Sequence, residues 1–106
     1  MTNLRLETLD VLRNAGKEPK DVKFVCRYDE KLHWYCTWDE FVAVIGDANY
    51  DAGYGTAEIA RNLLVVGNNW WLERHEYDGS EWWEYKERPV KPKDHKVPEH
   101  QDIFDQ

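Results

Sequence analysis

The sequence predicts an α+β protein built on an antiparallel sheet of about five strands with two helices. Two aromatic-rich runs, residues 70–77 and 80–85, flank an Asp78-Gly79 dipeptide, which is the strongest short-range signal for a β-hairpin. Upstream, segments of helical and strand periodicity alternate, and short connections join them. Because short connections favour antiparallel pairing, the expected element order is α-β-β-α-β-β-β.

Both predicted helices carry signals for their ends. In residues 3–15, leucines recur at helical spacing, and Gly16 can terminate the helix. Thr37 and Glu40 form a capping box, in which each side chain can bond the backbone amide of the other residue. The second helix is therefore expected over residues 38–45. Its inward side chains are expected to be Phe41, Val42 and Ile45.

Three strands are predicted before the hairpin. Residues 22–28 alternate at strand period, and residues 32–36 return as a second strand after a turn at 29–31. Residues 63–66 form a short apolar run, which predicts a central strand buried on both faces. One face of the first strand is expected to carry Val22, Phe24, Cys26 and Tyr28.

The charges of the hairpin predict its pairing register. A two-residue Asp78-Gly79 loop places Glu73 opposite Glu84, and like charges across a strand pair are unfavourable. A three-residue loop that includes Tyr77 shifts the pairing by one residue and removes this repulsion. We therefore expect the three-residue loop. It places Trp71, Trp83 and Tyr85 on the core side of the hairpin, and Leu72 and Trp82 on the other side.

Residues 1–88 are expected to form a single domain, followed at 89–106 by a polar tail that is extended or disordered. The tail contains three prolines and is rich in lysine, a composition that does not support a core. Its late bulky hydrophobic residues are Ile103 and Phe104. Two docking places are open for them, the body of the same chain and a neighbouring chain.

The formal net charge is −7, and the imbalance lies before Arg88, where 10 basic residues stand against 17 acidic ones. Residues 32–60 contain no Lys or Arg but hold five carboxylates. Such a region repels phosphate, so we expect no direct binding of nucleic acid. It favours a basic protein partner. The alternative is an ordinary solubilising surface.

The expected location is the cytoplasm, with reduced thiols and no membrane association. The chain has two cysteines, no apolar leader and no apolar run long enough to cross a bilayer. Cys26, His33 and Cys36 are weak candidates for a zinc site, because a Cys-x-x-Cys pair and a clear fourth ligand are missing. We expect no cofactor, and without a nucleophile–base pair we expect no catalytic activity.

The candidate partner-binding residues are surplus aromatic side chains and the acids around the glycine-rich loop at residues 49–55. Exposed Trp and Tyr side chains beside polar groups are typical of protein-binding hot spots. The alternative is that the aromatic residues complete the core. The expected contact residues are Trp34, Trp38, Asp47, Tyr50, Asp51, Tyr54, Glu58 and Trp82.

Three segments carry a resemblance to a known group of proteins: the loop Tyr-Asp-Ala-Gly-Tyr-Gly at 50–55, the apolar strand at 63–66 and the Trp-rich hairpin at 70–85. Together they resemble small acidic proteins encoded by phages and prophages of Gram-positive gut bacteria. The similarity runs from the first helix to about Pro92, and the hairpin is its most specific part. It implies the host bacterial cytoplasm as the location and supplies no catalytic residues.

The leading functional hypothesis is a non-catalytic phage accessory protein that binds a host or phage protein through an acidic, aromatic-rich surface. Inhibition of a host defence or nucleic-acid-processing component is one version, with imitation of DNA charge as its electrostatic form. Two alternatives stay open. One is a small-ligand or carbohydrate-binding domain with a pocket at Tyr50, Tyr54 and Trp82. The other is a self-associating structural protein that buries the second face of the hairpin in a homodimer.

Overall fold

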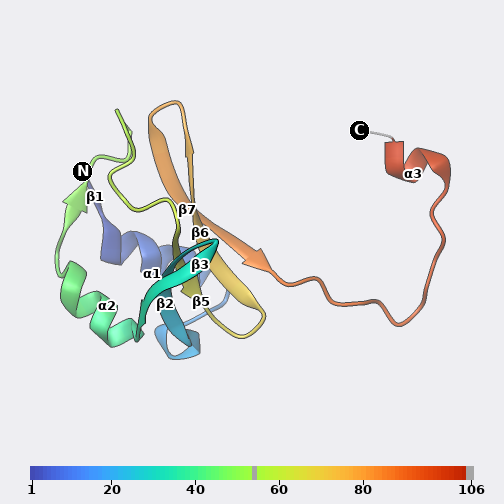
Figure 1. The fold of residues 1–106 in the computed structure, drawn as a ribbon, viewed down its shortest axis with the longest axis horizontal. Helices are drawn as coiled ribbons and strands as arrows, with labels where there is room; N and C mark the ends of the chain where they lie inside the picture. Colours follow the sequence, from blue (N-terminus) through green and yellow to red (C-terminus); the bar gives the residue numbers. More distant parts are fainter. Residues whose placement is uncertain (54, 105–106) are drawn as a thin grey trace.

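Five antiparallel strands form the main sheet in the order β3-β2-β5-β6-β7 (Figure 1). The computed structural model describes residues 1–53 and 55–104. The strands are β2 (Phe24–Asp29), β3 (Lys31–Cys36), β5 (Leu63–Val66), β6 (Trp70–Tyr77) and β7 (Ser80–Glu87). The predicted α+β class with an antiparallel five-stranded sheet is confirmed. A second sheet, which the sequence did not predict, pairs β1 (Thr2–Asn3) with β4 (Asn49–Tyr50).

Helices α1 (Leu4–Asn14) and α2 (Trp38–Ile45) pack against one face of the main sheet (Figure 1). The capping box of α2 is confirmed, with both the Thr37 and the Glu40 side chains bonded to the other's amide. The inward side of α1 differs from the leucine pattern, because Leu6 is exposed while Thr8 is fully buried. The shared core consists of Leu4, Leu12, Val25, Phe41, Tyr50, Leu63, Val65, Trp70, Leu72 and Trp83.

The predicted hairpin register is wrong. Tyr77 pairs with Ser80, so the loop has two residues, and Glu73 does face Glu84. Asp78 and Gly79 have φ values of 49° and 84°, the combination that a tight primed turn requires and that matches the twist of the strands. Turn geometry therefore decides the register. The expected core position of Trp71 and outer position of Leu72 are accordingly exchanged, while Trp83 and Tyr85 do face the helices.

Beyond β7 the chain leaves the body in an extended path and ends in a short helix, α3 (His100–Phe104). Figure 1 shows this arm running away from the sheet and from both main helices. The predicted extended tail thus contains one helical turn that its polar composition did not indicate. A 3-10 turn at Pro19–Asp21 connects α1 to β2.

Candidate functional site

The main sheet has one face covered by helices and one face that no helix covers within the described residues. Register places Tyr35, Cys26, Leu64, Glu73 and Glu84 in one row across the uncovered side. Its hydrophobic residues lie outside the core cluster that the helices share with the sheet. We call this side the open face. It is formed by Phe24, Cys26, Leu32, Tyr35, Leu64, Val66, Trp71, Glu73, His75, Trp82, Glu84 and Lys86.

Two tryptophans of the open face are each tied to a glutamate on their own strand. Trp71 Nε1 donates to Glu73 Oε1 at 2.7 Å, and Trp82 Nε1 donates to Glu84 Oε2 at 3.0 Å. His75 lies between the two carboxylates, with Nε2 at 2.6 Å from Glu73 Oε2 and Nδ1 at 3.5 Å from Glu84 Oε2. These five residues form what we call the indole–carboxylate array. The hairpin strands thus hold two half-buried indole rings beside two acids.

The hydrogen bonds of the array lower the pKa of both glutamates. At Glu73, burial works to raise the pKa, but the bonds from Trp71 and His75 outweigh it and the pKa lies below its usual value. At Glu84, the hydrogen bond from Trp82 is the largest cause of a lowered pKa. Lys86 Nζ also lies 3.2 Å from Glu84 Oε1. The array therefore presents negative charge next to aromatic surface.

An apolar hollow of about 220 Å³ lies over β2 and β3, lined by Phe24, Leu32 and Tyr35. The Phe24 and Tyr35 rings meet edge to face, with their centroids 6.3 Å apart, an arrangement that aromatic pairs favour. Leu32 and Tyr35 are among the exposed large hydrophobic residues of the chain. This hollow and the array belong to the two different hairpins of the sheet.

On the covered face, Arg74 is the centre of a buried charge cluster. Its side chain is 3% exposed and that of Glu81 is 4% exposed, with 3.0 Å between Arg74 Nη2 and Glu81 Oε1. Arg74 also contacts Glu7 and donates to the Tyr50 hydroxyl. Burial works to lower the pKa of Arg74, but its hydrogen bonds to Tyr50 and Glu81 and the charge of Glu7 outweigh this effect and leave the pKa above its usual value. Burial raises the pKa of Tyr50 to about 12.

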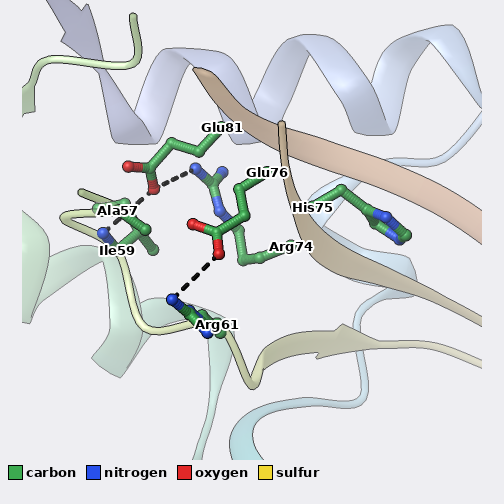
Figure 2. Close-up of a pocket in the computed structure, with 7 residues that line it drawn as sticks. All are labelled: Ala57, Ile59, Arg61, Arg74, His75, Glu76 and Glu81. Atoms are coloured by element: carbon green, nitrogen blue, oxygen red, sulfur yellow. Dashed lines mark hydrogen bonds and ion pairs between the residues drawn. The ribbon is translucent and has the colours of Figure 1, made fainter. Parts of the chain in front are cut away.

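The carboxylate of Glu81 also fixes the loop that crosses this cluster. It accepts hydrogen bonds from the backbone amides of Glu58 and Ile59, at 2.7 and 3.2 Å. Figure 2 shows the small pocket that results, with the Arg61–Glu76 ion pair at one side and His75 pointing away from it. Its volume is about 80 Å³, whereas sites for drug-sized ligands have about 300–1,000 Å³. The cluster therefore ties the loop to the sheet and leaves little room for a ligand.

The structure separates the residues that the sequence suggested as one partner surface. Trp82 lies on the open face, while Trp34 is exposed on the helix side of edge strand β3. Trp38 packs against Phe41, and Tyr50 is buried and so is not available for contact. The remaining acids lie outside the open face: Asp47 pairs with Arg5, Asp51 accepts from the Gly53 amide, and Glu58 accepts from the Asp51 amide. Tyr54 lies outside the described residues.

The structure does not bring together the residues of two predicted sites, the Tyr50–Trp82 pocket and the zinc site. A pocket shared by Tyr50 and Trp82 does not form, because Tyr50 lies over Arg74 on the covered face and Trp82 is on the opposite face. The zinc candidates do not converge either. Cys26 points to the open face and Cys36 to the core, while His33 bonds the carboxylate of Asp29. In residues 1–53 and 55–104, no group of three potential metal ligands comes together.

Sequence reasoning missed most of the open face, including Trp71, Glu73, His75, Glu84 and Tyr35. The signal that could have found the hairpin residues is the Asp78-Gly79 dipeptide, because a two-residue turn fixes which side chains share a face. The predicted alternation of Phe24 and Cys26 did identify one face of β2 correctly, and that face is the open one.

The part of the chain that the structure describes contains no helix long and apolar enough to cross a membrane. No protein-family model, curated protein or solved structure matches this chain at a significant level.

Proposed function

We propose that this protein is a non-catalytic binding protein that docks a basic protein partner on its indole–carboxylate array. The observation that carries the proposal is the pair of indoles on an uncovered sheet face, each held by a glutamate of its own strand. Tryptophan is enriched among the residues that dominate binding energy in protein interfaces. The hydrogen bonds fix the side chains before binding, which lowers the entropy lost when a partner docks.

The chemistry of the array favours a partner that presents Lys or Arg beside apolar side chains. The indole N–H groups of Trp71 and Trp82 are already satisfied, so the ring faces are what they offer. A cation over an indole face gains about 0.5–2 kcal/mol. Glu73 and Glu84, with their lowered pKa values, add attraction for the same cation. The net charge of −7 steers a basic partner toward the protein at long range.

We propose further that the protein acts in the cytoplasm of a bacterium as a phage or prophage accessory protein. The support is the resemblance of the loop and the Trp-rich hairpin to such proteins, together with the acidic charge of the body. Proteins that bind or process nucleic acids, including components of host defence, carry basic surfaces for phosphate. A protein that occupies such a surface excludes nucleic acid from it. Inhibition of a protein of this kind is the proposed role.

The test begins by capturing partners from a bacterial lysate with the full-length protein. Each captured protein is then purified and its dissociation constant is measured by calorimetry at several salt concentrations. We expect Trp82→Ala to weaken binding about tenfold or more, as at interface hot spots. Trp34→Ala is the matched control, because that exposed indole lies on the opposite side of the sheet, and it is expected to leave the affinity unchanged.

Added salt is expected to weaken the binding, because ionised Glu73 and Glu84 contribute to it. Circular dichroism of each variant establishes that the fold is intact. A partner that binds the Trp71→Ala/Trp82→Ala double variant as tightly as the wild type contradicts the proposal. So does an affinity that does not depend on salt.

A further inference from the structure

Helix α3 carries two bulky apolar side chains that stay largely exposed, although the Phe104 ring stacks on His100 of the same helix. Ile103 is 65% exposed and Phe104 is 66% exposed. The helix has five residues, and isolated helices shorter than about 12–15 residues are only marginally stable in water. A surface that buries Ile103 and Phe104 would therefore stabilise α3. The open face offers such a surface.

The hollow lined by Phe24, Leu32 and Tyr35 has the size and chemistry to take the ring of Phe104. Its volume is about 220 Å³, and an engineered apolar cavity of about 150 Å³ is enough to bind benzene. Its three lining side chains are a leucine and two aromatic residues, which suit another phenyl ring. The hollow is open to solvent, because Leu32 and Tyr35 are exposed.

We propose that the arm, residues 88–104, docks on a second copy of this chain and inserts Phe104 into the hollow of that copy. The arm runs away from its own sheet (Figure 1), and the molecule is elongated, at 50 × 32 × 29 Å. Exchange of identical segments between two copies is a common route to a symmetric dimer. A pair formed in this way makes the same contact twice.

The charge distribution supports docking of the arm on another copy. Residues 88–96 hold four basic residues and one acidic residue, whereas residues 1–87 hold 10 basic and 17 acidic ones. The first part of the arm is thus attracted to the acidic body of another copy.

The arm is also long enough for this path. The 13 steps from Glu87 to His100 extend to about 40 Å at roughly 3.3 Å per residue. A five-stranded sheet is about 19 Å wide between its edge strands, at about 4.8 Å per spacing. The arm is therefore long enough to reach the hollow at β2 and β3 of another copy from the β3 edge, without passing over the array on β6 and β7.

The test is analytical ultracentrifugation of the full chain over a range of concentrations. We expect the wild type to show a monomer–dimer equilibrium. Phe104→Asp on the arm and Leu32→Asp in the hollow are each expected to weaken the dimer about tenfold or more. Val44→Asp is the matched control, because Val44 is exposed on α2 and lies on the covered side, and its dimer is expected to match that of the wild type.

A mixture of the two Asp variants gives a sharper readout. Phe104→Asp keeps its hollow and Leu32→Asp keeps its arm, so a mixed pair regains one of the two contacts. We expect the mixture to associate more strongly than either variant alone. A wild type that stays monomeric at millimolar concentration overturns the proposal. This is the result expected if each arm docks on its own chain. A dimer that survives Phe104→Asp also overturns it.

This inference does not depend on the proposed function. Trp82→Ala is expected to leave the dimer intact, because Trp82 lies on β7 and the hollow lies over β2 and β3. Phe104→Asp is expected to leave binding of a basic partner at the array intact. The failure of one proposal is therefore separable from the failure of the other.

Discussion

Replacement of Arg74 by methionine tests the buried charge cluster most directly. Methionine keeps an unbranched side chain of similar length but removes the guanidinium. Glu81, with its side chain 4% exposed, then loses its cation, and so does Glu7, at 17% exposure. The loop at residues 58–59 is expected to be held less firmly, because the same carboxylate accepts hydrogen bonds from the amides of Glu58 and Ile59.

The structure sets the expected loss of stability. Removal of one partner from a buried ion pair costs about 3–5 kcal/mol. Two features place Arg74→Met at the lower end of that range: Glu81 keeps its two backbone hydrogen bonds, and Arg74 Nε is buried without a hydrogen-bond partner among the described residues. The guanidinium also lies 4.9 Å from the Trp83 ring centroid, a contact worth about 0.5–2 kcal/mol. We expect a loss of about 3–4 kcal/mol.

The assay is urea unfolding followed by tryptophan fluorescence, with the free energy of unfolding extrapolated to water. Arg61→Met is the matched control. It removes a guanidinium that pairs with Glu76, but the Arg61 side chain is 79% exposed, and exposed pairs contribute at most about 1 kcal/mol.

A loss below about 1 kcal/mol for Arg74→Met, equal to the control, refutes the reasoning, since it means that the cluster does not stabilise the fold. The double variant Arg74→Met/Glu81→Gln provides a second check. Neutralising the stranded carboxylate is expected to recover part of the loss, because the two groups are coupled. A double variant less stable than Arg74→Met argues that the hydrogen bonds of Glu81 to the loop matter more than its charge.

Three further predictions follow from single contacts. Tyr50 is expected to titrate at about 12, and stability is expected to fall as pH rises from 10 toward that value, because the raised pKa favours the neutral hydroxyl of the folded state; ultraviolet titration of wild type and Tyr50→Phe checks this, and a step near pH 12 that persists in Tyr50→Phe contradicts it. Gly67→Ala is expected to cost about 1–3 kcal/mol, because the added Cβ would lie 2.0 Å from Cε2 of the buried Trp70 ring; Gly53→Ala, with its nearest atom at 3.8 Å, is the control in urea unfolding, and equal midpoints would exclude the clash. The interactions that lower the pKa of Glu73 stabilise the fold above the unperturbed pKa of 4.5, and this stabilisation is lost as pH falls through the folded pKa. The difference in unfolding free energy between wild type and Glu73→Gln is therefore expected to be largest near pH 7 and to shrink in acid. A difference that grows in acid contradicts this prediction.

Local signals predicted most of the fold. The capping box of Thr37 and Glu40 and the run at 63–66 located α2 and β5 at their observed bounds. These signals work because caps and periodicity are properties of neighbouring residues. The two-residue strands β1 and β4 escaped prediction, because pairs so short are defined by their tertiary partner and carry no pattern of their own.

The candidate site was harder to predict, because distant residues determine which side chains are exposed. The repulsion of Glu73 and Glu84 that argued against the observed register is relieved by His75 and by two indole N–H groups. The second like-charged pair, Glu76 with Glu81, is relieved by Arg61 and Arg74 from elsewhere in the fold. A comparison of directly opposite residues includes the two acids but not their other partners. It therefore predicted the wrong face of the sheet for Trp71.

The two proposed docking surfaces, the hollow and the array, lie on the same face of the sheet because of the strand order. The hollow is carried by the β2–β3 hairpin and the array by the β6–β7 hairpin, and β5 joins them through its pairing with β2 and β6. The register of each hairpin is set within that hairpin, whereas the β2–β5 pairing joins residues that lie far apart in the sequence. Each surface is therefore carried by its own hairpin, and β5 is the strand that connects the two. Sequence changes can alter the specificity of one surface while the other stays as it is.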